Sequence, residues 1–186
     1  MMLCATSGAI AAPSWNQLSA GYTKVNVDNF EAATGHQFSG TVELSESLFA
    51  SASIQKTSEM LIVELDDTFD EFKVNHTDMR FGLGFVKEIN KQIDAYFAVH
   101  YVSQKDKFEQ FANDENGFSA GVGVRYSLTK DYEIGLLLEH IDIKEETDIK
   151  VEGEIRLAAS KTLAVVGRYA RYQDANQFYI GAAYYF

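Results

Sequence analysis

The sequence predicts an all-β protein, a single transmembrane antiparallel up-and-down β-barrel of ten strands, with eight strands as the alternative count. Apolar residues alternate with polar or small residues along most of the chain, and short and long connections alternate between these segments. A membrane-spanning helix needs about 20 predominantly apolar residues, and no run of that length occurs. The chain is therefore expected to cross a membrane with strands or not at all.

The composition narrows the class further. A chain of 186 residues is long enough for one domain, and 13% aromatic residues with a single proline are not typical of disorder. The formal net charge of −11 argues against an electrostatic grip on nucleic acid. A soluble β domain or a membrane β-barrel remains.

The period-two alternation defines ten segments. It is clearest at the C-terminus, where Phe178, Ile180, Ala182, Tyr184 and Phe186 alternate with polar, small or tyrosine residues. The expected strands cover residues 18–23, 38–44, 48–55, 78–86, 93–102, 119–128, 132–139, 149–158, 163–170 and 177–186.

The connections are of two kinds, which predicts two different ends for the barrel. Tight turns are expected at residues 45–47, 88–91, 129–131 and 160–162, and larger polar connections at 28–37, around 66–68, and at 105–117, 145–148 and 173–176. Short periplasmic turns and longer external loops are typical of outer-membrane barrels.

Two apolar stretches near the larger connections predict hairpins that project past the membrane. Residues 60–63 are too apolar for a loop tip, so the third strand is expected to reach about Leu65 and to return through 69–72. Ile141 and Ile143 suggest a second projecting hairpin.

The polar face predicts an interior of paired charges. Small residues suit the crowded inside of a narrow barrel, and arginine offers a planar fork to carboxylates. A charge facing lipid at mid-membrane would cost roughly 2–4 kcal/mol, so these charges are expected inside. The predicted lumen network comprises Glu43, Asp78, Arg80, Asp94, His100, Arg125, Glu139, Glu152, Glu154, Arg156 and Arg168, with Glu133 on the same face. Its excess of carboxylates would bias any path towards cations. A soluble sandwich, with apolar residues inward, is the alternative.

Aromatic residues bracket the strands, as two interfacial girdles would. One predicted girdle contains Trp15, Phe85, Tyr126, Tyr132, Tyr184 and Phe186, and the other contains Tyr22, Phe38, Tyr101, Phe118, Tyr169 and Phe178.

The N-terminus indicates export. Residues 1–11 are uncharged and end in Ala9-Ile10-Ala11, a small-x-small site of the kind signal peptidase cuts. We expect 1–11 to be the remnant of a signal peptide, with the true start upstream, and 12–186 to form the barrel. Cys4 would leave with the signal.

These features resemble the small outer-membrane β-barrel proteins of Gram-negative bacteria. The resemblance is carried by residues 121–126 (GVGVRY), residues 80–85 (RFGLGF) and the ending 179–186 (YIGAAYYF). It implies a location in the outer membrane, contact with outer-membrane lipid and lipopolysaccharide, and a C-terminal signal read by the barrel-assembly machinery. That signal would be Phe178, Ile180, Ala182, Tyr184 and Phe186.

The sequence offers little chemistry. None of the four histidines has metal-ligand spacing, so no metal, cofactor or catalytic residue is assigned. His76 and Asp78 share a face and are the best catalytic candidates, but we expect no enzyme.

The first functional hypothesis is a largely closed, monomeric structural or surface-interaction barrel with a protein partner at its hairpins. A narrow porin is the alternative, and an outer-membrane enzyme ranks third. The acidic external connections could also bridge to lipopolysaccharide phosphates through divalent cations.

Overall fold

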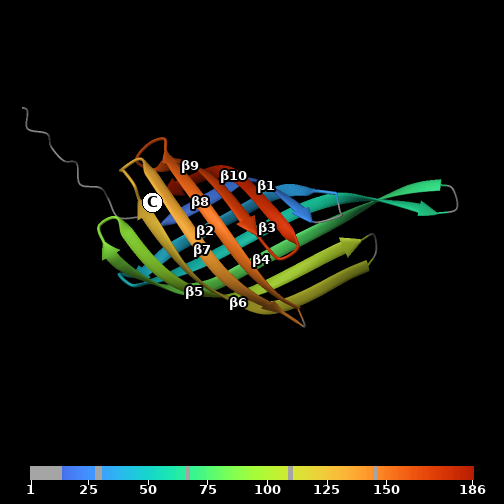
Figure 1. Ribbon diagram of the computed structural model, residues 1–186, viewed down its shortest axis with the longest axis horizontal. Helices are drawn as coiled ribbons and strands as arrows, with labels where there is room; N and C mark the ends of the chain where they lie inside the picture. Colours follow the sequence, from blue (N-terminus) through green and yellow to red (C-terminus); the bar gives the residue numbers. More distant parts are fainter. Residues whose placement is uncertain (1–13, 28–30, 66–67, 109–110, 145) are drawn as a thin grey trace, which may run out of the picture.

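Ten antiparallel strands form a closed barrel in the computed structural model (Figure 1). The structure describes residues 14–27, 31–65, 68–108, 111–144 and 146–186, with the side chains of 61–71 excluded. The strands are β1 (Gln17–Val27), β2 (Ala33–Ser45), β3 (Leu48–Leu65), β4 (Thr68–Asn90), β5 (Ile93–Phe108), β6 (Phe111–Ser127), β7 (Tyr132–Ile143), β8 (Glu146–Ala158), β9 (Leu163–Arg171) and β10 (Ala175–Tyr185). The predicted ten strands are confirmed. The described residues contain no helix long and apolar enough to cross a bilayer.

Each strand pairs with its neighbours in sequence, and β10 returns to close the barrel against β1. The closing seam runs in register from the pair Gln17–Tyr185 to the pair Val27–Ala175. Closure leaves no open sheet edge around the barrel wall. This matters in a bilayer, where no water is present to satisfy an unpaired backbone group.

The apolar face of the strands lies on the outside. Leu83 is 61% exposed and Ile180 63%, and Phe81, Val122 and Val124 are exposed as well. The alternative of a soluble sandwich with these residues in a dry core is therefore wrong. Both predicted girdles face outward at the positions named, except for Trp15, which is buried.

The strands extend beyond the predicted bounds at one end of the barrel. Figure 1 shows β3–β4 as the longest projection, with β5–β6 beside it, both at the end away from the C-terminus. The long-hairpin end is our name for this side, and the short-turn end for the other. The prediction that the third strand reaches Leu65 is confirmed, while its tip at 66–67 lies outside the described residues.

Two predictions about the connections are wrong. Residues 105–117 were expected to be a loop, but β5 and β6 continue in register to the pair Phe108–Phe111. Cross-strand charge pairing supports this extension, since Lys105 Nζ lies 3.0 Å from Asp114 Oδ2. Ile141 and Ile143 do not lie in a hairpin that stands clear of the wall, because β7 stays paired with β6 as far as Ile143 and both side chains are buried. The predicted signal segment lies outside the described residues.

Candidate functional site

Aromatic side chains pack together inside the lumen at the short-turn end. Trp15, which precedes β1, is 5% exposed and stacks on Phe49 with ring centroids 4.4 Å apart. Tyr96 meets the indole edge to face at 5.1 Å, and Val86 and Ala98 pack against the same group. We call these five residues the aromatic plug. The prediction of Trp15 in an interfacial girdle is wrong, because the chain before β1 turns into the lumen.

Polar contacts from three strands hold Trp15 in this position. Its indole N–H donates to Asp94 Oδ2 at 2.9 Å, and its carbonyl accepts from the Thr41 hydroxyl. The guanidinium of Arg125 lies 4.6 Å from the indole centroid and donates to the Ser14 carbonyl at 2.9 Å. A cation over an indole face is attracted by the ring quadrupole. The plug is therefore anchored by hydrogen bonds as well as by packing.

Glu139 is the centre of the ion-pair network in the middle of the lumen. Its carboxylate lies 2.7 Å from Lys150 Nζ and 3.1 Å from Arg80 Nη1, and it accepts a hydrogen bond from the Ser119 hydroxyl at 2.6 Å. The same two cations also contact a second carboxylate each, Asp78 for Arg80 and Glu152 for Lys150. Glu139 is only 2% exposed, so these partners replace water around its charge.

Glu154 and Glu133 form a second centre, nearer the short-turn end. Arg156 Nε lies 2.5 Å from Glu154, and Arg168 Nε lies 3.1 Å from the other oxygen of that carboxylate. The latter contact is close but not aligned as a hydrogen bond, so we treat it as purely ionic. Arg125 pairs with Glu133 at 2.7 Å, which links the network to the plug.

The structure brings most of the predicted network residues together, with two corrections. Glu43 is exposed and accepts a hydrogen bond from Asn16, because it lies near the end of β2, at the short-turn rim of the barrel. Asp94 is buried but serves the indole of Trp15. Lys150 was missed as a network member, although it shares a face with Glu152 and Glu154. With Lys150 inside and Glu43 outside, five cations meet six carboxylates, and the predicted bias towards cations largely disappears.

His100 occupies a row of inward-facing residues across four neighbouring strands. Ser51, Gly82, His100 and Ser119 pair in register from β3 to β6. On β7 the partner of Ser119 is Ile141, and Glu139, two residues before it, accepts a hydrogen bond from the Ser119 hydroxyl. His100 Nε2 lies 2.8 Å from the Ser51 hydroxyl, and Nδ1 lies 3.7 Å from Glu139 Oε1. A Cβ on Gly82 would come within 2.7 Å of the imidazole, so the glycine lets the ring reach across β4.

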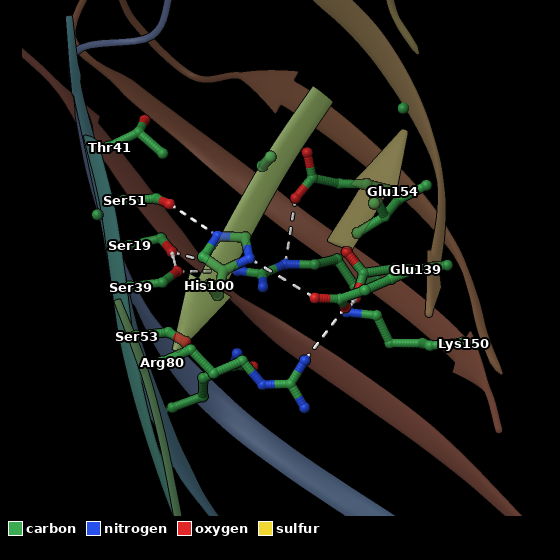
Figure 2. Close-up of a pocket in the computed structure, with 18 of the residues that line it drawn as sticks. Ser19, Ser39, Thr41, Ser51, Ser53, Arg80, His100, Glu139, Lys150 and Glu154 are labelled. Atoms are coloured by element: carbon green, nitrogen blue, oxygen red, sulfur yellow. Dashed lines mark hydrogen bonds and ion pairs between the residues drawn. The ribbon is translucent and has the colours of Figure 1, made fainter. Parts of the chain in front are cut away.

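A wall of hydroxyl groups faces the charges across a cavity of about 230 Å³. The hydroxyl wall, as we define it, comprises Ser19, Ser39, Thr41, Ser51 and Ser53, from β1, β2 and β3. Figure 2 shows it opposite Glu139, Lys150 and Glu154, with the side chain of Arg80 extending across the lumen from beside Ser53. The lumen is thus divided into a neutral polar side and a charged side.

A second packed cluster lies towards the long-hairpin end. Val102, Ile141 and Ile143 are buried against Tyr172, and we call these four residues the outer cluster. Beside it, the Tyr172 hydroxyl lies 3.1 Å from Gln177, whose amide in turn donates to Gln55 at 2.7 Å. Apolar constrictions of this kind exclude water from a pore. Packed side chains therefore lie towards both ends of the cavity.

His76 lies beyond the apolar, lipid-facing part of the barrel wall. The neighbouring outward-facing positions there are Lys56, Thr77 and Lys105, none of which is apolar. Its Nδ1 lies 2.7 Å from Asp106 and its Nε2 lies 3.4 Å from Glu59, so it pairs with these residues and not with Asp78. The hydrogen bond to Asp106 raises the pKa of His76 above its ordinary value, with both carboxylates adding attraction and burial opposing.

The described residues contain no group of three or more His, Cys, Asp or Glu side chains arranged to hold a metal ion. The C-terminal alternating residues lie on the outer face, with Phe178, Ile180, Tyr184 and Phe186 each at least 49% exposed and Ala182 beside them. Their role as an assembly signal stays a prediction.

Comparison with known proteins identifies the fold and the family model that the chain matches. The model described as "Outer membrane protein beta-barrel domain" matches residues 1–186. Among solved structures, the NanC porin is similar with a TM-score of 0.56 and 9% identity, covering 91% of this chain and 100% of its own. The KdgM porin gives 0.54 and 12%, covering 90% and 99%. OprG from Pseudomonas aeruginosa gives 0.53 and 10%, covering 96% and 99%. No functionally curated protein matches significantly.

Replacing Glu139 by Gln is expected to destabilise the barrel by about 3 kcal/mol, because two buried cations lose their shared carboxylate. We place the effect at the low end of the usual range since Arg80 and Lys150 each keep a second partner. Urea unfolding in lipid vesicles measures it. Glu115→Gln, which removes an exposed partner of Lys144, is the matched control and should change little. A loss below about 1 kcal/mol for Glu139→Gln would contradict the network's role.

The stability of the hairpin around His76 is expected to depend on pH. Because the pKa of His76 is raised in the folded state, the protonated ring stabilises the fold fully below its unfolded pKa of about 6.5, and this contribution is lost as pH rises through the folded pKa. Hydrogen exchange of the 75–77 amides, corrected for intrinsic rates, should show protection falling over that window. Asp106→Asn should flatten the dependence, and equal pH dependence in both proteins would refute the assignment.

Proposed function

The chain belongs to the outer membrane protein beta-barrel family and lies in the outer membrane, and from that premise we propose that it is a largely closed barrel with a structural or surface-interaction role. The closed lumen carries this proposal. The aromatic plug, the ion-pair network and the outer cluster lie one after another along the barrel axis. A solute would have to displace all three to pass through.

The projecting hairpins support the surface role. Beyond Ser58, β3 has no further pair with β2, and beyond Val74, β4 has none with β5, so the ribbon between these residues stands clear of the wall. We propose that a protein partner meets this end, and that lipopolysaccharide and outer-membrane lipid surround the barrel, which acts as a monomer. The acidic residues along the hairpins, with Glu59, Asp106 and Asp114 among them, suit contact through divalent cations.

A narrow porin is the second candidate. The fold it shares with the KdgM and NanC porins favours this candidate, although a likeness at 9–12% identity extends to architecture alone. The two candidates differ in whether the three closures stay shut.

An enzymatic role is not proposed, although Ser51, His100 and Glu139 stand in the order of a serine–histidine–acid triad. The 3.7 Å between His100 Nδ1 and Glu139 Oε1 exceeds a hydrogen bond, and the carboxylate is already shared by Arg80 and Lys150. A serine-directed fluorophosphonate is expected to leave Ser51 unmodified, as read by peptide mass spectrometry. Stoichiometric labelling that His100→Ala abolishes would overturn this expectation.

Purified, refolded protein is expected to give no unitary current steps in planar bilayers, because three packed layers block the axis. An established porin reconstituted in the same bilayers shows that steps would be seen. Reproducible steps from the wild-type chain would refute the closed barrel and support the narrow porin.

A further inference from the structure

We propose that the cavity between the hydroxyl wall and the ion-pair network binds a neutral polyol of monosaccharide size. The cavity measures about 230 Å³, below the 300–1,000 Å³ usual for drug-sized ligands, so only a small molecule fits. Its lining combines hydroxyl, amide, carboxylate and guanidinium groups with aromatic rings, as Figure 2 shows for part of it.

The lining matches the hydrogen-bonding of sugar hydroxyls, each of which both donates and accepts. Ser51 and Ser53 offer hydroxyls that do the same, and the buried amide oxygen of Gln37 has no partner among the described residues. On the charged side, His100 Nδ1 is buried and lacks a hydrogen bond as well. Each atom has under 1 Å² of accessible surface, so a ligand hydroxyl satisfies it only after a neighbouring side chain moves aside. The rings of Trp15 and Tyr96 add an apolar floor.

The charge balance selects a neutral ligand. Each of the five lumen cations already contacts a carboxylate, with Arg80, Lys150 and Arg156 contacting two each. A charged ligand must break one of these buried pairs or remain uncompensated beside them, which should weaken its binding at least about a hundredfold. Uncharged hydroxyls join the existing hydrogen bonds without disturbing any pair.

Access is easier from the long-hairpin end. The contacts that join Tyr172, Gln177 and Gln55 there are hydrogen bonds between neutral groups, whereas the aromatic plug is fixed by stacking, a cation–π contact and the bond to Asp94. Opening the outer cluster alone admits a ligand to the cavity and leaves the other end shut. A ligand can therefore bind in the cavity without passing through the barrel. This proposal does not depend on whether a protein partner meets the hairpins.

Trp15 provides the readout, because it is the only tryptophan of the chain and lines the cavity. The full-length protein, folded in detergent, is titrated with glucose, glucuronate and glucosamine, three rings of one size with no charge, a negative charge and a positive charge. We expect a saturable fluorescence change with glucose, and binding at least about a hundredfold weaker for the two charged sugars. Equilibrium dialysis with radiolabelled glucose gives the same affinity without relying on the indole.

Two variants locate the site. Ser39→Ala combined with Ser53→Ala removes two hydroxyls of the lining and should weaken glucose binding about tenfold. Ser103→Ala, on the outward face of β5, is the matched control and should leave binding unchanged. The proposal is overturned if neither method detects saturable glucose binding, if a charged sugar binds as well as glucose, or if the control loses as much affinity as the double variant.

Discussion

The structure depends on the cost of placing charge and unpaired backbone against hydrocarbon. Both costs are removed by one geometry, in which a closed sheet pairs its own backbone and every ionised side chain at membrane depth faces inward. The exposed leucines, valines and phenylalanines of the wall follow from it, as do the buried charges Glu139, Lys150 and Arg125. A ten-stranded barrel is narrow, so charges directed inward are brought into contact with one another.

That crowding explains the character of the lumen. Arg80 and Lys150 share Glu139, and Arg156 and Arg168 share Glu154, so each carboxylate neutralises more than one cation. A buried ion pair adds little net stability, but breaking it is costly. The lumen is therefore held in one arrangement, and its neutral side, lined by serines, is left as the place where a ligand can be accommodated. Packed aromatic and aliphatic groups lie towards the two ends.

Most of the fold was predictable for two reasons. Apolar residues alternate with polar or small ones along segments such as 178–186, and the lipid-facing side of a strand tolerates almost no charge. The lumen residues were predicted in part, because alternation along a strand determines which side chains point inward. Arg80, Arg125 and Glu154 point into the lumen, as the alternation predicts. The position of Trp15 could not be predicted, because it precedes the first predicted strand and lies outside the alternating segments.

The side-chain contacts between lumen residues could not be predicted from the alternation either. The alternation marks His100 and Lys150 as inward, but only the register from β3 to β5 brings Ser51 beside His100, and Glu139 approaches diagonally from β7. Ile141 was misjudged because an apolar residue near a strand end suits both a projecting hairpin and an inner cluster.

The position of Trp15 tests the account most directly, because it distinguishes a filled, closed lumen from any arrangement with the indole at the membrane surface. In vesicles of lipids brominated along the acyl chain, we predict that Trp15 fluorescence is not quenched by bromine, and that dissolved iodide leaves it unquenched as well. A tryptophan at the lipid-facing position 81, introduced as Phe81→Trp together with Trp15→Phe, should be strongly quenched by the brominated lipid. Equal quenching of Trp15 and the tryptophan at position 81 would contradict the central claim.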